Sequence, residues 1–273
     1  MNNFKSLVPK SLKKKIVLIR LCYIKLFKLI NKNILKPVIK FYFKYWFDNT
    51  GTNNNLICLE KREFIDAYSC ASIATKIKLD NKMRIHQALW CAKSALKLKG
   101  DIVELGCGAG FTFYSILKYL DSDDLGWRKS KVVYLYDSFI PVKPNLIDGS
   151  QVQSNELIQN PTAYSSSFSN VCALFSQWEN VKITEGRLPE ILQLSHNYPE
   201  QISFLHIDLN HYKAEIESLN VLWINIVQGG FILLDDYANP GRDKQRLAFD
   251  EFFTKFDLEI LTLVSGQGLV IKN

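Results

Sequence analysis

DIVELGCGAG, residues 101–110, is the stretch that decides the fold, because a short apolar run ends there in a glycine-rich turn. Glycine lets the backbone turn tightly and come close to a ligand. The spacing is G-x-G-x-G, and Phe111 stands where the dinucleotide-binding pattern G-x-G-x-x-G would have its third glycine. The stretch therefore predicts a strand, a ligand-binding turn and a helix, and leaves the ligand open.

The chain around this stretch alternates short apolar runs with helical patterns, which is typical of a βαβ series. Ser265-Gly266-Gln267 is too short for a parallel crossover, so the two strands that it joins must form an antiparallel hairpin. The fold class is α/β, a doubly wound Rossmann-like sheet that binds ligands beyond the carboxyl ends of its strands. We expect strands near 101–105, 131–136, 181–185, 202–207, 230–234, 258–264 and 268–272, and helices near 111–120, 166–178, 188–195, 212–226 and 242–256.

Two carboxylates beside the glycine turn indicate the ligand. Glu104 would repel a pyrophosphate but would suit the ammonium and sulfonium groups of S-adenosylmethionine (SAM). Asp137 ends the next strand and can accept hydrogen bonds from both hydroxyls of a ribose, although alone it could cap a turn. Together they favour SAM over a nicotinamide cofactor. The cofactor-binding positions from this pattern are Glu104, Gly106, Cys107, Gly108, Gly110, Asp137, Ser138 and Phe139.

With these residues the sequence resembles the class I SAM-dependent methyltransferases and, within them, the macrocin O-methyltransferase family of sugar-methylating enzymes. The resemblance implies a seven-stranded sheet with an antiparallel last strand, and methyl transfer from SAM to a hydroxyl of a sugar or glycoconjugate. Gly186 joins the cofactor-binding positions. The resemblance is carried by residues 100–106, 134–139, Gly186-Arg187-Leu188-Pro189, Asp208 with Tyr212, and 229–237.

Three further carboxylates follow two neighbouring strands of this series. Asp208 closes the strand near 202–207, while Asp235 and Asp236 close the strand near 230–234. Three acids at one edge need a cation, and hard oxygen ligands suit Mg²⁺ better than zinc. Such an ion could chelate two sugar hydroxyls and lower the pKa of one, as the resembling family is understood to do. Without a metal, Asp208 would orient backbone near SAM, and Asp235 or Asp236 would cap the next turn.

Two residues that follow Asp208 bear on catalysis. The family often has a second acid there, whereas this chain has Asn210, which weakens the metal assignment. His211 is a candidate general base beside the catalytic candidate Asp208, since an imidazole pKa of about 6.5 suits removal of a hydroxyl proton. His206 lies within a strand and is expected in the packed core. The long polar segment 140–165 is where we expect acceptor specificity, or a plain surface excursion.

The first 47 residues hold twelve Lys and Arg and no acid, so the net charge of +7 leaves residues 48–273 at −5. We expect a basic amphipathic helical extension (1–50), a polar linker at 48–55, a helical cap region (51–99) and a methyltransferase domain (100–273). No apolar stretch in the extension is long enough to span a membrane, so we expect a cytoplasmic protein.

The extension has two interpretations. Residues 10–47 could contact an anionic membrane peripherally, or the extension could pack on the domain or on a second copy in a homo-oligomer. Nucleic acid is not an expected partner. For the whole chain, the alternatives to a sugar O-methyltransferase are a metal-free small-molecule methyltransferase and a membrane-associated, non-catalytic partner protein with a SAM fold.

Overall fold

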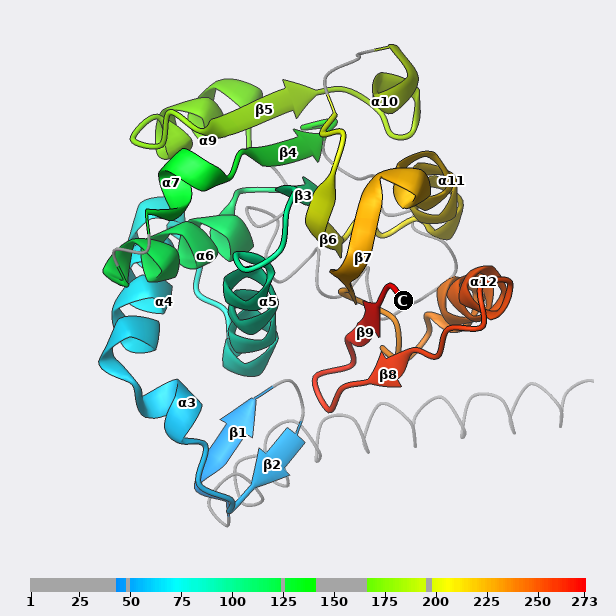
Figure 1. Cartoon of the computed structure of the whole chain (residues 1–273). Coiled ribbons are helices and arrows are strands. Elements are labelled where there is room, and N and C mark those ends of the chain that lie inside the picture. Colours follow the sequence, from blue (N-terminus) through cyan, green and yellow to red (C-terminus); the bar gives the residue numbers. More distant parts are fainter. Residues whose placement is uncertain (1–42, 48–49, 124–125, 141–165, 195–197) are drawn as a thin grey trace, which may run out of the picture. The chain divides into compact units, whose positions relative to one another are not determined.

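The computed structural model describes residues 43–47, 50–123, 126–140, 166–194 and 198–273 (Figure 1). They fall into two compact units that divide between Asn55 and Leu56, and each is described by itself. Within the described part, no helix has the length and apolar character needed to cross a membrane. The basic extension before residue 43 and most of the proposed acceptor segment, 141–165, lie outside the described residues.

The described part of the first unit is a two-stranded antiparallel hairpin, formed by β1 (Tyr45–Phe47) and β2 (Thr50–Thr52). The expected polar linker at 48–55, and the end of the expected helical extension, are therefore wrong at these positions. The physical reason is local. An aromatic run favours a strand, and Asn53 closes the hairpin by accepting a hydrogen bond from the backbone N–H of Lys44 at 2.9 Å.

A seven-stranded sheet forms the centre of the second unit, in the order β5-β4-β3-β6-β7-β9-β8. The first five of these strands are parallel, while β9 runs antiparallel to β7, and β8 to β9. The predicted fold class and the predicted C-terminal hairpin are both confirmed. The strands are β3 (Asp101–Leu105), β4 (Val133–Asp137), β5 (Val181–Glu185), β6 (Ile202–Ile207), β7 (Ile226–Leu234), β8 (Leu261–Thr262) and β9 (Gly268–Ile271).

The helices follow the expected series with shifted ends. The helix expected at 212–226 stops at Leu222, and a 3₁₀ turn leads into β7, which begins four residues earlier than expected because Ile226 pairs with Ile202 on β6. The helices are α3 (Ile57–Glu60), α4 (Arg62–Thr75), α5 (Lys82–Ala95), α6 (Phe111–Ser122), α7 (Trp127–Ser130), α9 (Phe168–Phe175), α10 (Glu190–Leu194), α11 (Tyr212–Leu222), η2 (Trp223–Asn225) and α12 (Asp243–Thr254).

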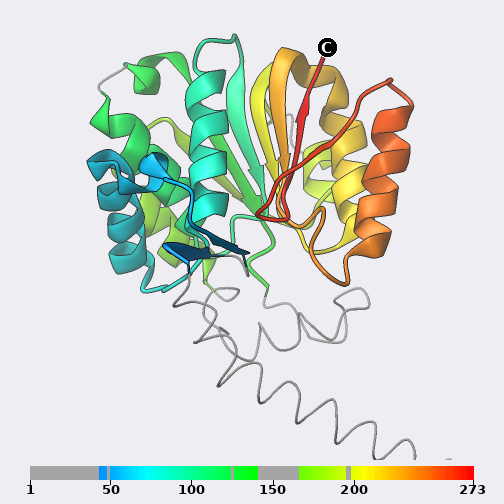
Figure 2. The same ribbon diagram turned by 90° about the horizontal axis from the view of Figure 1, so that it is seen from below.

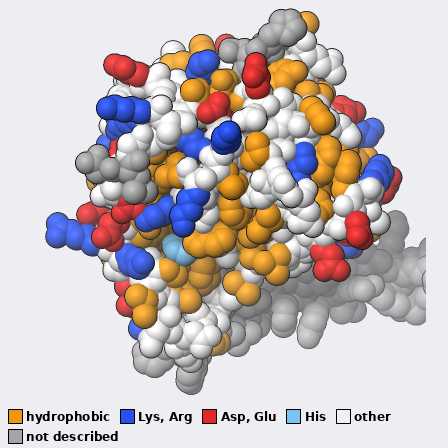
Figure 3. Space-filling view, in the orientation of Figure 1, with side chains coloured by type: hydrophobic (Ala, Val, Ile, Leu, Met, Phe, Trp, Pro, Cys, Tyr) orange, Lys and Arg blue, Asp and Glu red, His pale blue; other side chains and the backbone are white. Residues whose placement is uncertain are grey.

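Helices cover both faces of the sheet, with α4, α5 and α6 on one side and α11 and α12 on the other (Figure 2). Successive side chains of a strand point to opposite faces of the sheet, so the sheet separates two apolar cores. Leu105 packs in the cluster that includes Phe249 and Phe253 of α12. On the opposite face, Phe113 of α6 stacks on Phe204 of β6 with ring centroids 6.3 Å apart. Positive and negative side chains are mixed over the face seen in Figure 3, and Lys and Arg do not form one continuous patch on that face.

Backbone hydrogen bonds align the carboxyl ends of four neighbouring strands. Gly106 donates to the carbonyl of Tyr136 at 2.8 Å, Asp208 to that of Leu105 at 2.8 Å, and the N–H of Asp235 to β6 at 3.0 Å. At Gly106 φ is 94°, and a Cβ there would stand 1.9 Å from the carbonyl oxygen of Asp208. The glycine therefore lets the ends of β3 and β6 approach, and the candidate site lies at this edge.

Candidate active site

The glycine turn joins β3 to α6 as the sequence predicts. Gly110 has a φ of 84° and precedes the first residue of α6, and a Cβ on it would stand 2.7 Å from the Phe175 ring. Cys107 is buried in the turn, and burial raises the pKa of its thiol well above the usual range. Because the Cys107 thiol stays neutral, the polar groups that this turn offers a ligand are those of its backbone.

Asp137 connects this turn to the end of β4. One carboxylate oxygen, Oδ2, accepts a hydrogen bond from the N–H of Gly108 at 2.7 Å, and Oδ1 accepts one from the N–H of Phe139 at 2.7 Å. Each carboxylate oxygen can accept a second hydrogen bond. Asp137 is therefore held in a defined orientation and retains acceptor capacity for the hydroxyls of a ribose.

The other cofactor-binding candidates lie around Asp137. Ser138 Oγ accepts a hydrogen bond from the N–H of Ile140 at 3.3 Å. Phe139 has a φ of 49°, and its ring lies 5.5 Å from that of Phe168. Gly186, after β5, donates to the carbonyl of Asp137 at 2.9 Å. The structure thus brings together the positions that the sequence assigned to SAM.

Glu104 is buried on β3, with 2% of its surface exposed. Its Oε1 lies 3.1 Å from His206 Nδ1, while Oε2 has no hydrogen-bond partner among the described residues. Burial raises the pKa of Glu104 to about 7. An unpaired carboxylate oxygen in a buried position is costly, and a cationic ligand group would relieve that cost. Glu104 therefore fits the ammonium or sulfonium of SAM with one of its two oxygens.

His206 is fully buried, as the sequence predicts, but it also links two carboxylates. Its Nε2 lies 3.5 Å from Asp235 Oδ1, opposite the contact with Glu104. Burial alone would lower the pKa of His206, but Asp235 and Glu104 outweigh it and raise the pKa to about 10. The protonated ring of His206 therefore lies between Glu104, in the part of the site assigned to SAM, and Asp235. Asp235 belongs with Asp208 and Asp236 to what we call the acid cluster. The sequence pattern of a strand does not indicate such a role for a histidine.

Asp235 and Asp236 lie just beyond β7 and are held by side chains from other elements. Arg84, on α5, bonds to Asp235 Oδ2 and lies 3.4 Å from Asp236 Oδ1. Gln267, before β9, donates to Asp235 Oδ1 at 2.7 Å. Arg242 donates to Asp236 Oδ2 at 2.6 Å. All four oxygens of these two carboxylates therefore have protein partners.

Two acids of the cluster, Asp208 and Asp235, have pKa values shifted in opposite directions. Burial would raise the pKa of Asp235, but Arg84 and His206 outweigh it and hold the pKa well below the usual range. For Asp208, burial and the negative charges of Asp235 and Asp236 raise the pKa well above the usual range. Positive side chains therefore favour the ionised form of Asp235, whereas the surroundings of Asp208 favour its protonated form.

The predicted Mg²⁺ site finds no support in these contacts. Among the described residues, no group of three or more His, Cys, Asp or Glu side chains is arranged to hold a metal ion. Arg84 lies between Asp235 and Asp236, which is where a shared cation would have to be. The described side chains do not fit the three-carboxylate site expected for Mg²⁺, and the metal stays a prediction.

The segment after Asp208 turns at Asn210, whose φ is 60°. Asn210 Nδ2 donates to Asp208 Oδ1 at 3.3 Å, and its carbonyl groups accept from Arg242. His211, the candidate base, caps α11 by accepting a hydrogen bond from the N–H of Ala214 at 3.4 Å. This contact gives the imidazole a structural role, and its catalytic role stays a prediction.

Sequence reasoning did not connect the cations of the site to the acid pair Asp235-Asp236. Arg84 precedes Asp235 by 151 residues and belongs to a helix, so its position among other charged helix residues carried no distinguishing signal. Arg242 stands at the start of the helix expected near 242–256, and Gln267 lies in a turn that the sequence marked only as a connection. The sequence offered one clue: Asp208, Asp235 and Asp236 follow neighbouring strands with no basic residue beside them. Buried carboxylates are usually paired, so a positive partner from elsewhere in the chain was to be expected.

Comparisons with known proteins add a family and a fold. The family model described as macrocin-O-methyltransferase (TylF) matches residues 57–259. No curated protein matches the chain. Among solved structures, the O-methyltransferase NovP is similar with a TM-score of 0.53 and 21% identity, over 70% of this chain and 79% of NovP. CalS11, a TDP-rhamnose 3′-O-methyltransferase of calicheamicin biosynthesis, has a TM-score of 0.48 and 12% identity, over 77% of this chain and 95% of CalS11.

Proposed function

The chain belongs to the macrocin O-methyltransferase family and is a SAM-dependent O-methyltransferase, and from this premise we propose that it methylates a hydroxyl group of a sugar or glycoconjugate. The resemblance found in the sequence is thereby confirmed at the level of the family. The observation that carries the proposal is the meeting of two halves at one sheet edge: the SAM half with Glu104 and Asp137, and the acid cluster with Asp208, Asp235 and Asp236.

The SAM half has donors and acceptors of the required kind. Asp137, held by the N–H groups of Gly108 and Phe139, would accept hydrogen bonds from the ribose hydroxyls. Glu104 would face positive charge with its unpartnered Oε2. The glycine turn, which lacks side chains at three positions, would let the ligand approach the backbone. When bound, SAM supplies an electrophilic methyl group on a sulfonium.

The acid cluster supplies the proton acceptor. Methyl transfer needs the acceptor oxygen in line with the methyl carbon, and loss of the hydroxyl proton as the new O–C bond forms. Burial raises the pKa of Asp208 well above the usual range, and the positive sulfonium of bound SAM would favour the ionised form that accepts the proton. Arg84 and Arg242 hold Asp235 and Asp236 in place as hydrogen-bond acceptors for neighbouring hydroxyls. We therefore assign the proton to Asp208 and the orientation of the acceptor to Asp235 and Asp236.

The SAM half is tested by Asp137→Asn. This change removes the charge and one of the two backbone contacts, and hydrogen bonds to charged groups contribute about 1.5–3 kcal/mol each. We expect SAM to bind at least about tenfold more weakly in isothermal titration. Asp66→Asn, on the exposed face of α4, is the matched control and should leave binding unchanged. Equal affinity of the Asp137 variant and the parent would remove Asp137 from the site.

The predicted Mg²⁺ is tested separately by chelation. The proposed methyl transfer does not pass through a metal, because Arg84, Arg242 and His206 already bring positive charge to Asp235 and Asp236. Turnover is followed as release of S-adenosylhomocysteine with a panel of sugar acceptors, before and after EDTA. If the ion is required, EDTA abolishes turnover, spares SAM binding, and added Mg²⁺ restores activity. Persistence of turnover in EDTA favours the metal-free methyltransferase, the second candidate, which the arginine contacts support.

A further inference from the structure

His206 lies in the middle of the sheet, and strand pairing brings it beside Glu104. The histidine on β6 is in register with Glu104 of β3 on one side and with Leu233 of β7 on the other. Paired residues of neighbouring strands point to the same face of a sheet. His206 is fully buried, so its ring nitrogens have to find their hydrogen-bond partners within the protein.

Two aromatic rings fix the plane of the imidazole. Phe113 of α6 stacks on it with ring centroids 6.1 Å apart and an angle of 30° between the planes. Phe204, two residues earlier on β6, lies at 6.4 Å and 29°. Protein interiors are close-packed, so the ring cannot turn without displacing these neighbours. Its two nitrogens therefore point in fixed directions, Nδ1 toward Glu104 and Nε2 toward Asp235.

The two contacts of the imidazole differ in length. Nδ1 lies 3.1 Å from Glu104 Oε1, within the usual range of a hydrogen bond, whereas Nε2 lies 3.5 Å from Asp235 Oδ1, beyond it. Carboxylate oxygens accept hydrogen bonds, so Nδ1–H is the donor to Glu104. A carboxylate that is held at one oxygen has its other oxygen in a defined place. In Glu104 that other oxygen is Oε2, which has no hydrogen-bond partner among the described residues.

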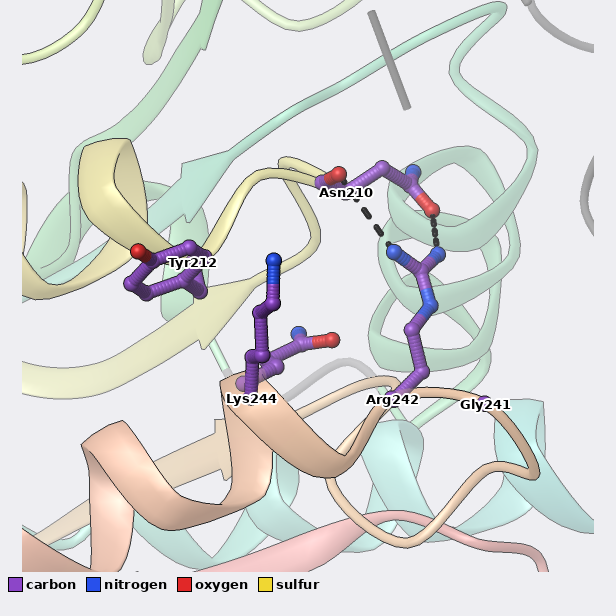
Figure 4. A pocket seen from close by; sticks show the side chains of 6 residues that line it. Asn210, Tyr212, Gly241, Arg242 and Lys244 are labelled. Carbon is purple, nitrogen blue, oxygen red and sulfur yellow. Dashed lines mark hydrogen bonds between the residues drawn. The ribbon is translucent and has the colours of Figure 1, made fainter. Parts of the chain in front are cut away.

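Asp235 is firmly held on the other side of the ring. Gln267 donates to the same oxygen, Oδ1, at 2.7 Å. The rest of the acid cluster is held in turn by Arg242, which donates to Asn210, as Figure 4 shows. The acid cluster therefore gives His206 a fixed neighbour, and Glu104 is the partner whose orientation the histidine can decide.

We propose that His206 is a positioning residue for methyl transfer, which holds Glu104 with its Oε2 turned toward the positive groups of SAM. His206 acts on SAM only through Glu104. Without the Nδ1 contact the carboxylate is free to turn about its side-chain bonds, and SAM loses a preorganised partner. Because the same ring faces Asp235, the orientation of Glu104 is tied to the position of the acid cluster. This proposal rests on the proposed function.

Two substitutions of His206 separate its two contacts. Asparagine can place its amide nitrogen near the position of Nδ1, and glutamine can place it near that of Nε2. His206→Asn therefore keeps a donor for Glu104, whereas His206→Gln keeps a donor for Asp235 only. Both variants lose the ring that stacks on Phe113 and Phe204. They are therefore matched in the packing that they lose, and the contact with Glu104 distinguishes them.

Isothermal titration of the full chain with SAM compares the variants. We expect His206→Gln to bind SAM at least about tenfold more weakly than the parent, which is the order of magnitude of one hydrogen bond to a charged group. His206→Asn should recover most of this loss. In a chain that already carries Glu104→Gln, the further change His206→Gln should weaken SAM binding less than about twofold, because contacts that act through one another are not additive.

Nitrogen NMR of the parent chain, labelled at histidine, tests the proposal even where His206→Gln does not fold. The Nδ1 resonance of His206, assigned through its proximity to the Phe113 ring, should shift when SAM is added. Equal SAM affinities of the asparagine and glutamine variants, additive losses from Glu104→Gln and His206→Gln, or an unchanged resonance would each contradict the positioning role. Failure of the parent chain to bind SAM would instead contradict the proposed function.

Discussion

Arg84 shows how a single side chain changes the interpretation of a motif. The pair Asp235-Asp236 suggests a metal site when only the sequence is considered, since two adjacent acids at a strand end need a cation. In the structure, the guanidinium of Arg84 contacts both carboxylates and also donates to Asn239 Oδ1 at 2.9 Å. Removing one partner of a buried ion pair typically costs about 3–5 kcal/mol. Arg84 therefore stabilises the acid pair in its present position.

Glu215 leads to a prediction about pH at the same scale. Its carboxyl is buried, and burial together with the negative charge of Asp236 raises its pKa to about 8 from an ordinary 4.5. Between these two values the folded state keeps a proton that the unfolded state has lost. Stability from this group is therefore full below pH 4.5 and falls as the pH rises to about 8.

Glu215→Gln should remove this pH dependence, because glutamine resembles the protonated side chain. We expect the variant to be more stable than the parent at pH 8, by an amount on the order of a few kcal/mol, and the advantage to shrink at pH 5. Urea unfolding at both pH values measures the difference. Glu217→Gln, two residues later on α11 and exposed, is the control. A variant whose stability changes with pH as the parent's does would show that Glu215 ionises in the folded state.

At the scale of elements, the connection from β3 to α6 shows which parts of the site local sequence can specify. Glycines after a buried strand predicted the turn, and the turn forms where expected. The sequence could not show why Gly106 is required, because the close neighbour is the carbonyl of Asp208, about a hundred residues later. The turn and the end of β6 are therefore positioned together.

Gly106→Ala should separate this tertiary effect from local backbone strain. Alanine at positive φ costs about 1–2 kcal/mol, and a Cβ 1.9 Å from the Asp208 carbonyl adds overpacking of about 1–3 kcal/mol. Gly126→Ala has a similar positive φ of 60° with no atom within 4 Å of the new Cβ, so it should show only the first cost. Thermal unfolding compares the two variants. A Gly106 variant that melts with the Gly126 variant would contradict the close packing.

At the scale of the whole molecule, the chain divides between Asn55 and Leu56, and the SAM half and the acid cluster both belong to the later unit. The helices expected as a separate cap region, 51–99, belong with the sheet from Leu56 onward, and Arg84 from α5 contributes directly to the site. The basic residues before position 48 account for the positive net charge of the chain. All the described residues of the candidate site lie after them in the sequence.

A chain of residues 56–273 should therefore fold and bind SAM within about twofold of the full-length affinity in isothermal titration. The same pair of proteins tests the predicted peripheral membrane contact. The full chain should sediment with vesicles that contain anionic phosphatidylglycerol, and the shorter chain, whose charge is negative, should not. Loss of SAM binding in the shorter chain would assign the first unit a role in the site. Equal sedimentation of the two chains would contradict membrane contact through the extension.

The sequence by itself determined the sheet, the glycine turn, the antiparallel end and the type of cofactor, because these depend on patterns within about ten residues: apolar runs, glycine spacing and the acids next to them. It misplaced the hairpin at 45–52 and the start of β7, where pairing with a neighbouring strand decides the ends. Only the tertiary structure decided the charge balance of the acid cluster. Arg84, His206, Arg242 and Gln267 reach Asp235 and Asp236 from four separate elements, and electrostatic partners over such sequence distances leave no local pattern.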